Sequence, residues 1–322
     1  MKVSVLITTF NHEGFISQAI DSVLMQEVKF DYEIVIGEDA STDRTQEIVL
    51  AHEKKYPGKI RVLLHDPIGA ARDRALGIGG KSNFMESLRA CQGQYLALLD
   101  GDDYWTDPHK LQKQTDFLDN HPDFAICFHD VELFYEDKTR KPRNYCPPNQ
   151  KEISTIADLL GGNFMQTCSV MLRNHLFGEL PEWFYSAIIG DWVFHILNAE
   201  YGKIGYLNEV MAAYRVHQGG FWTSFDQLDQ YKEQLKIFDH LDEYLGAGYK
   251  KQIEAGRAKS YQSMSEVHYR RGDIAGAWSA LVKSLRIFLS INSIPNRQLL
   301  GRLIKLQTYK IYEWLGLRFR PT

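Results

Sequence analysis

The sequence has 322 residues, of which 44% are hydrophobic and 24% charged, and its formal net charge is -4. This composition is typical of a globular protein that can bury a sizeable core, and the near-neutral charge argues against nucleic-acid binding. No apolar run approaches the roughly 18 residues of a membrane span, and the first residues enter a strand pattern instead of a signal peptide, so we expect a cytoplasmic protein.

Strand and helix patterns alternate through the first hundred residues. Apolar runs of strand length are separated by stretches whose apolar residues recur at helical spacing. Because strands joined through helices form parallel βαβ units, this order predicts a parallel sheet. The expected strands are residues 3–8, 32–37, 60–64 and 95–99, and the expected helices lie near residues 15–24, 43–51 and 84–91.

Residues 66–81, between the third strand and the next helix, are rich in glycine and charge. This composition predicts a mobile loop. Residues 77–82 superficially resemble a phosphate-binding loop, but Ala75 stands where that pattern needs glycine and the preceding strand lies too far upstream.

The second half continues with both kinds of pattern but less regularly. It predicts a helix at 108–118, a strand at 124–134, a charged, proline-rich hinge or surface loop at 137–151, a strand at 166–172, a helix opening at 188–192, a strand at 210–216 and helices from 226 onward.

Polar side chains follow three of the predicted parallel strands. The first strand ends in Thr-Thr-Phe-Asn at residues 8–11, the second in Glu-Asp at 38–39 and the fourth in Asp-Gly-Asp-Asp at 100–103. In open α/β sheets ligands bind outside the carboxyl ends of the strands, so these groups converge on one site. Clustered carboxylates need a cation, and hard oxygen ligands suit Mg²⁺ or Mn²⁺ bridging to a phosphorylated ligand.

The acidic stretch allows two other interpretations. A helix-loop-helix calcium site fails, because its positions 5 and 12, counted from Asp100, are Tyr104 and Leu111. A solvated acidic turn is the commoner use of such residues. The other polar strand ends count against that alternative, because all three groups meet at one edge.

Five pieces of sequence, in order, resemble the family 2 glycosyltransferases: VSVLITTFN, EIVIGEDASTD, GQYLALLDGDDYW, GDW and YRVHQGG. The resemblance extends from about residue 3 to residue 220. It implies the A-type glycosyltransferase fold, an α/β architecture with a mostly parallel Rossmann-like sheet, followed by an α-helical C-terminal region. The implied domains are a catalytic domain at 1–222, with a nucleotide-sugar half at about 1–107 and an acceptor half at about 108–222, and a helical region at 223–322.

The resemblance also implies a role for individual residues. The implied nucleotide contacts are Thr8, Phe10, Asn11, Asp39, Lys81, Asn83 and Asp100. The implied metal site consists of Asp102, with Asp103 in support and His217 as a further metal or diphosphate contact. Arg215 would stabilise the loop or the leaving diphosphate, and Asp191 occupies the position of the catalytic base.

Two departures from the commonest family pattern stand out. Glu38 replaces the more usual first Asp of the second piece, and GDW at 190–192 stands where many members have two acids before the helix. Neither departure removes Asp39 or Asp191, the carboxylates that the implied roles require.

The function that the resemblance implies is a metal-dependent transfer of a sugar from a nucleotide-diphospho-sugar, with a UDP-sugar as the first choice and Mn²⁺ or Mg²⁺ as the ion. The acceptor would be a hydroxyl of a carbohydrate or lipid-linked glycan in surface polysaccharide or cell-envelope biosynthesis, and the reaction would invert the anomeric configuration.

Two alternative functions share parts of this pattern. A sugar-1-phosphate nucleotidyltransferase would need a glycine-rich, basic segment after the first strand, which residues 9–13 do not offer. A nucleotide-sugar-binding module without turnover would have no need of a positioned base beside Asp39 and Asp102. Both features favour the transferase.

The C-terminal third lies outside the resemblance. Residues 258–285 have the pattern of a helical hairpin similar to one tetratricopeptide-like unit. Residues 283–322 contain eight Lys or Arg and one Glu interleaved with apolar and aromatic side chains. A basic aromatic helix of this kind predicts peripheral contact with the inner face of the plasma membrane. Docking on the protein's own core or on a partner subunit is the alternative.

Overall fold

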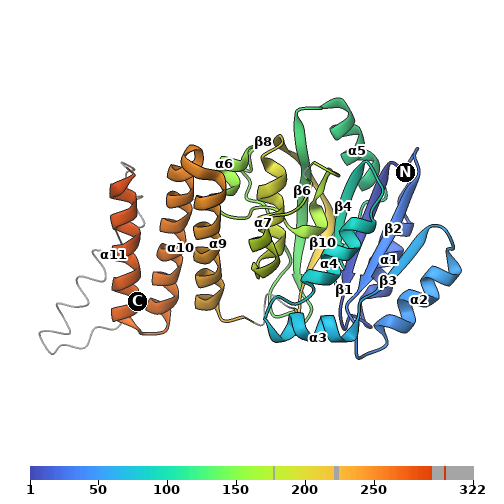
Figure 1. The fold of residues 1–322 in the computed structure, drawn as a ribbon, viewed down its shortest axis with the longest axis horizontal. Coiled ribbons are helices and arrows are strands. Elements are labelled where there is room, and N and C mark those ends of the chain that lie inside the picture. The colour runs from blue at the N-terminus through green and yellow to red at the C-terminus, as the bar shows by residue number, and fades with distance from the viewer. Residues whose placement is uncertain (177, 221–224, 292–300, 302–322) are drawn as a thin grey trace, which may run out of the picture. The chain divides into compact units, whose positions relative to one another are not determined.

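The computed structural model describes residues 1–176, 178–220, 225–291 and 301. The chain divides into two compact units, one formed by Met1–Leu159 with Asn163–Thr223 and the other by Leu160–Gly162 with Ser224–Thr322. The first unit is a mixed α/β domain, and the described part of the second is helical (Figure 1). The predicted fold class is confirmed.

Parallel strands form the first half of the sheet in the order β3-β2-β1-β4. They are β1 (Val3–Thr9), β2 (Tyr32–Glu38), β3 (Ile60–Leu64) and β4 (Tyr95–Asp100). Every residue of β2 is buried, Glu33 and Glu38 included, as expected of a parallel strand covered on both faces. The helices between them are α1 (Ile16–Leu24), α2 (Thr45–Lys55), α3 (Pro67–Ala75) and α4 (Lys81–Ala90).

The second half of the sheet is mixed and continues in the order β4-β9-β6-β10-β5. Its strands are β5 (Tyr104–Trp105), β6 (Phe124–Tyr135), β7 (Arg143–Asn144), β8 (Ile153–Ser154), β9 (Met171–Arg173) and β10 (Lys203–Val216). Strand β9 is antiparallel to β4 and to β6, whereas β10 runs parallel to β6. The helical elements are α5 (Lys110–Asn120), α6 (Ile156–Leu159), η1 (Thr167–Ser169), η2 (Glu182–Ser186) and α7 (Gly190–Ala199).

Three sequence predictions need correction. Residues 66–81 were expected to be a loop, but helix α3 begins at Pro67 after Asp66, whose side chain accepts from Gly69 N. Only residues 171–173 of the strand expected at 166–172 are extended, because residues 167–169 form the 3₁₀ turn η1. The strand expected at 210–216 begins at Lys203, and register shifts between Leu207 and Ala212 break the alternation that would have revealed it.

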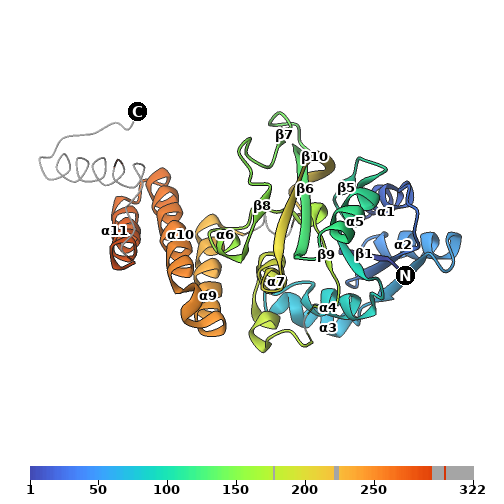
Figure 2. The same cartoon turned by 90° about the horizontal axis from the view of Figure 1, so that it is seen from above.

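Helices cover both faces of the sheet (Figure 2). Helices α1, α2 and α5 pack on one face, whereas α4 and α7 pack on the other. The main hydrophobic core lies under α1 and α5 and takes the alternate residues Val3, Val5 and Ile7 of β1. The loops at the carboxyl ends of β1, β2 and β4 therefore extend from a rigid, fully covered base.

The described part of the second unit contains α9 (Gln227–Leu245), η3 (Gly246–Tyr249), α10 (Lys250–Arg270) and α11 (Ile274–Ser290). Helices α10 and α11 form a hairpin around Ala258, Ala277 and Leu281. Asp226 and Asp273 cap α9 and α11 through Leu228 N and Gly276 N.

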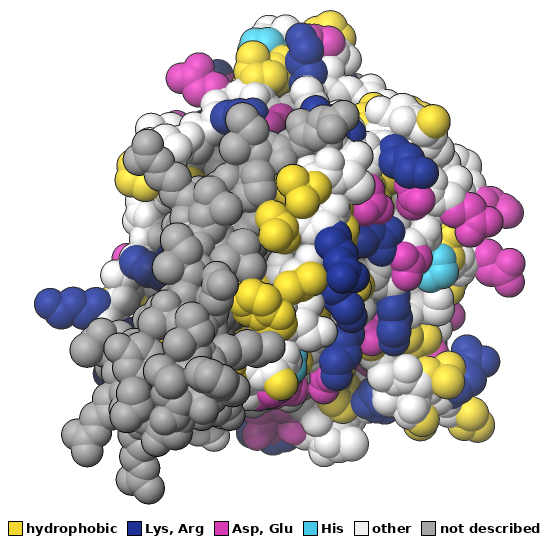
Figure 3. All heavy atoms as spheres, turned by 90° about the vertical axis from the view of Figure 1, so that its left-hand side faces the viewer, with side chains coloured by type: hydrophobic (Ala, Val, Ile, Leu, Met, Phe, Trp, Pro, Cys, Tyr) yellow, Lys and Arg dark blue, Asp and Glu magenta, His cyan; other side chains and the backbone are white. Residues whose placement is uncertain are grey.

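The basic region predicted at 283–322 lies mostly outside the described residues, which include only 283–291 and 301 of it. Figure 3 shows a face on which Lys and Arg side chains gather beside hydrophobic ones. No helix in the described ranges combines the length and apolar character needed to cross a membrane.

The close approach of α4 to β2 depends on Gly37. A Cβ at this position would collide with Ser87 Oγ and lie 2.5 Å from Asn83 Oδ1. We expect Gly37→Ala to lower the free energy of unfolding by about 1–3 kcal/mol, because the helix must shift away from the strand. Urea unfolding of this variant and of Gly14→Ala measures the effect. A Cβ on Gly14 meets no atom within 4 Å, so equal unfolding midpoints would contradict the prediction.

Candidate functional site

Strand register brings the three polar strand ends together. Thr8 is paired with Asp100 across β1 and β4, and Thr9 is paired with Glu38 across β1 and β2. Beyond the strands, Asp39 N donates to Thr9 O at 3.0 Å and Gly101 N donates to Thr8 O at 2.9 Å. The first residues of the three loops are therefore fixed to one another by backbone hydrogen bonds.

Asp39 and Phe10 form one side of the site, together with Arg74 from α3. The Arg74 guanidinium lies 4.4 Å from the centre of the Phe10 ring, and its Nη1 donates to Asp39 Oδ2 at 3.1 Å. Burial raises the pKa of Asp39 to about 6, and the charge of Arg74 only partly offsets this. Asp39 Oδ1 is buried and has no partner among the described residues, so it is available to accept from a ligand N–H or O–H.

Asn11 and Asn83 hold backbone segments instead of facing the site. Asn11 adopts a left-handed conformation with φ 53°, and its Oδ1 accepts from Thr42 N at 2.8 Å. Asn83, 2% exposed, donates from Nδ2 to Gly37 O at 3.0 Å and so fixes α4 to β2. Of the predicted nucleotide contacts, these two side chains are occupied by the protein itself.

The three acids of residues 100–103 differ in environment. Asp100 Oδ1 accepts from Thr8 Oγ1 at 3.0 Å, and burial, followed by the charge of Asp102, raises its pKa to about 7. Asp103 is 2% exposed, and burial with the charge of Asp102 raises its pKa well above the usual range. Burial also acts to raise the pKa of Asp102, but the hydrogen bond from His217 and the charge of His12 outweigh it, so that its pKa is lowered. Asp102 is the acid that stays ionised.

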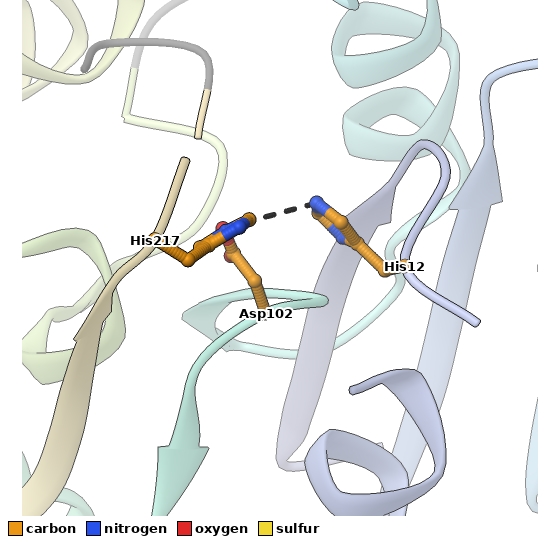
Figure 4. Close-up of side chains that lie close together, drawn as sticks. All are labelled: His12, Asp102 and His217. Atoms are coloured by element: carbon orange, nitrogen blue, oxygen red, sulfur yellow. Dashed lines mark hydrogen bonds and ion pairs between the residues drawn. The ribbon is translucent and has the colours of Figure 1, made fainter. Parts of the chain in front are cut away.

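His12, Asp102 and His217 come from three separate loops and point toward one another (Figure 4). Asp102 Oδ2 lies 3.0 Å from His217 Nε2 and 3.8 Å from His12 Nε2. One potential ligand atom from each residue lies within 4.8 Å of the others. A carboxylate oxygen with two imidazole nitrogens is a donor set that binds divalent first-row metal ions, so these residues fit a metal site.

Two of the three predicted metal residues are brought together in this group. Asp102 and His217 belong to it, whereas Asp103 does not: Asp103 Oδ1 accepts from Arg215 N at 2.8 Å. His12 was not among the predicted site residues. It lies directly after the Thr-Thr-Phe-Asn segment, and that position beside the acidic loop was the signal that could have identified it.

Arg215 connects the acidic loop to its surroundings. Its Nε donates to Asp102 O at 2.8 Å and its Nη2 to Gln18 Oε1 at 2.8 Å, while Nη1 pairs with Glu136. The guanidinium also lies 4.5 Å from the centre of the Phe15 ring. Strand β10 therefore ends in fixed contact with the loop, and this places His217 beside Asp102.

Asp191 lies in the first turn of α7, where Asn163 Nδ2 donates to its Oδ2 at 3.0 Å. Its charge is close enough to contribute to the raised pKa of Asp100. Lys81, from the start of α4, has its Nζ 4.2 Å from the centre of the Phe184 ring. A Cβ on Gly190 would lie 2.5 Å from that nitrogen, so the ammonium occupies the space beside the first turn of α7.

The chain is similar in sequence to a known protein family and to individual proteins. The family model described as glycosyl transferase family 2 matches residues 4–177. An uncharacterized protein of Mycobacterium tuberculosis is 35% identical over 307 residues, which cover 95% of this chain and 79% of that protein.

Two similar solved structures share the fold. That of Staphylococcus aureus TarS 1–349 in complex with UDP has a TM-score of 0.62 and 18% identity, and the match covers 99% of this chain and 93% of that one. That of a mannosyltransferase from Pyrobaculum calidifontis in complex with GDP-Man and Mn²⁺ has a TM-score of 0.57 and 13% identity, and covers 97% and 81% of the two chains.

The buried ammonium of Lys81 gives a pH-dependent prediction. Burial lowers the pKa of Lys81 to about 8, and the charge of Asp191 partly offsets this decrease. Below that pH the folded protein holds a poorly solvated charge, and Lys81→Met should raise the free energy of unfolding at pH 7 by about 1–3 kcal/mol. Between pH 8 and the ordinary lysine pKa of 10.5 the folded state loses this proton before the unfolded state does, so wild-type stability rises and the difference shrinks.

Urea unfolding at a series of pH values measures this difference. Lys54→Met, at an exposed position of α2, is the matched control and should leave stability unchanged at every pH. A Lys81→Met protein less stable than wild type at pH 7 would contradict the prediction, since the ammonium would then be well paired.

Proposed function

Because the chain belongs to glycosyl transferase family 2, we propose that it moves a sugar from a nucleoside-diphosphate sugar to a hydroxyl of a carbohydrate or lipid-linked acceptor, with inversion at the anomeric carbon. Membership of a glycosyltransferase family counts against a sugar-1-phosphate nucleotidyltransferase and against a non-catalytic module. The observation that carries the proposal is the sheet edge at which Asp39, Asp100 and Asp102 converge on one site.

The proposed donor is a UDP-sugar. The unpartnered Oδ1 of Asp39 is suited to accept from the imide N–H of uracil, and Phe10 offers an aromatic face beside it. Related structures hold UDP, UDP-GlcNAc or GDP-Man, and both uracil and guanine carry such an N–H. Thr8 and Asp100 lie next to this position and are the proposed contacts to the ribose. Lys81 and Asn83 are proposed to contact the nucleotide only after a movement of α4, the helix that carries both.

A divalent ion, Mn²⁺ or Mg²⁺, is proposed to bind at Asp102 and His217, with Asp103 and Arg215 supporting the loop that carries Asp102. When bound, such an ion neutralises the charge of the leaving nucleoside diphosphate. The mannosyltransferase neighbour that holds Mn²⁺ supports this assignment.

Asp191 is the proposed catalytic base. Its carboxylate would take the proton of the acceptor hydroxyl as that oxygen forms its bond to the anomeric carbon. The bond from the anomeric carbon to the diphosphate oxygen breaks at the same time, and its electron pair leaves with the nucleoside diphosphate. Asn163 holds Oδ2 of Asp191, which orients the other oxygen for this transfer.

The proposed role is assembly of cell-envelope glycan, in the cytoplasm or at the inner face of the plasma membrane. A sequence relative, the poly(ribitol-phosphate) beta-N-acetylglucosaminyltransferase TarS, is 29% identical over 122 residues. This match covers 38% of the chain and supports the general class of acceptor only.

The donor assignment is tested by titrating the full chain with UDP-, GDP-, dTDP- and CDP-sugars, each with and without Mn²⁺, in a calorimeter. We expect tight binding of a UDP-sugar only with the ion, and at least a tenfold loss in Asp102→Asn, since one buried ionic contact is worth about 1.5–3 kcal/mol. Asp137→Asn, in an exposed loop, should bind like wild type. Failure of every nucleotide sugar to bind would refute the proposed function.

The role of Asp191 is tested by Asp191→Asn. We expect kcat to fall by about 10²–10⁴, because the amide cannot accept the proton, while the Kd for the donor stays the same. Turnover with a panel of acceptor glycans and product anomer analysis by NMR measure both points. An unchanged kcat would exclude Asp191 as the base, and a product that keeps the donor's anomeric configuration would exclude single displacement.

A further inference from the structure

His12 has a role that the proposed function does not explain. It lies on the loop after β1, and its Nε2 is 3.8 Å from the same oxygen of Asp102 that His217 contacts at 3.0 Å. A single hydrogen bond to this carboxylate oxygen would need only one imidazole. A second imidazole at the same oxygen is typical of a site for a metal ion.

The orientation of His12 is fixed by its neighbours. Its Nδ1 lies 3.3 Å from Thr9 Oγ1, and its backbone N donates to Thr45 Oγ1 at 2.8 Å. A Cβ on Gly101 would lie 2.9 Å from His12 Nδ1, so the glycine between Asp100 and Asp102 leaves room for the ring. With Nδ1 held in this way, Nε2 points toward Asp102 (Figure 4).

The other two ligand atoms are equally constrained. His217 packs edge-on against Phe15, with 4.9 Å between ring centres. The backbone of Asp102 is held by Arg215 Nε at 2.8 Å. The positions of all three donor groups are therefore set by the folded chain and need no nucleotide to bring them together.

The spacing suits a single metal ion. Ligand atoms at about 2.1 Å from a metal lie roughly 3.0 Å apart when adjacent in an octahedron and roughly 4.2 Å apart when opposite. The separations of 3.0 and 3.8 Å from Asp102 Oδ2 fall within this range, and one ligand atom from each of the three residues lies within 4.8 Å of the others.

We propose that His12 is a third protein ligand of the metal ion, so that the free protein binds the ion before the donor arrives and prefers a first-row transition ion to Mg²⁺. This inference rests on the proposed function, because it takes Asp102 as the carboxylate ligand. Imidazole nitrogen binds transition ions well, whereas Mg²⁺ is held by oxygen ligands and water. A site with two imidazoles therefore disfavours Mg²⁺.

The test measures metal binding to the full chain without nucleotide, with Mn²⁺ and Mg²⁺ as probes. Calorimetry should detect one Mn²⁺ per chain, bound more tightly than Mg²⁺. His12→Phe keeps the ring shape but removes the nitrogen donor, and it should weaken Mn²⁺ at least about tenfold, since even an indirect partner of a metal contributes 10–100-fold. His12→Gln supplies an amide oxygen and should lower the ratio of Mn²⁺ to Mg²⁺ affinity. His109→Phe, at a half-exposed position away from the group, should match wild type.

Electron spin echo spectroscopy of bound Mn²⁺ gives a readout independent of affinity and of activity. Coupling to two imidazole nitrogens is expected in wild type and to one in His12→Gln. If His12→Phe does not fold, the wild-type and His12→Gln spectra still decide.

One imidazole in the wild-type spectrum, unchanged Mn²⁺ affinity in both His12 variants, or Mn²⁺ binding only after addition of UDP would overturn the proposal. These results would leave sugar transfer intact. Absence of nucleotide binding with normal Mn²⁺ binding would instead count against the proposed function.

Discussion

Three carboxylates at the end of one buried strand cannot all remain charged, and the site is built around this constraint. Burial and mutual repulsion raise the pKa values of Asp100 and Asp103, whereas two histidines lower that of Asp102. Carboxylates whose pKa values are driven apart by their environments have separate tasks. Asp102 is suited to bind a cation, Asp100 accepts a hydrogen bond from Thr8 Oγ1, and Asp103 accepts one from the backbone N of Arg215.

Arg215 connects the acidic loop, which follows the parallel half of the sheet, to β10 in the mixed half. It belongs to β10, and it contacts the acidic loop after β4, Gln18 of α1 and Glu136 directly after β6. At 8% exposure it is an almost buried cation among carboxylates and rings, and such a group needs all of its partners. These contacts fix the end of β10, which also pairs with β5 directly after the acidic loop, and His217 therefore lies beside Asp102.

The sequence predicted the parts of the site that follow from strand order. Thr8, Asp39 and Asp100 each end an apolar run, and the rule for parallel strands was enough to bring them to one edge. Helix α3 was missed because its glycine and charge suggested a loop, although Asp66 followed by Pro67 is a helix start signal. Arg74, which pairs with Asp39, was missed with it. His12 was missed although it directly follows the first polar strand end, because its partners Asp102 and His217 are distant in sequence and only the folded chain brings them beside it.

At Gly190, where this chain departs from the commonest family pattern, the space beside the backbone is filled by a neighbouring side chain. The place of a side chain at this position is taken by the ammonium of Lys81, which reaches across from α4 and lies on the ring of Phe184. The same two helices also pack through Phe84 and Phe194, whose ring centres are 5.3 Å apart. A side chain at 190 would require the flexible end of Lys81 to shift, whereas glycine leaves the ammonium in this place. Helix α4, which borders the proposed donor site, therefore packs against α7, which carries the proposed base. A shift of either helix would displace the other.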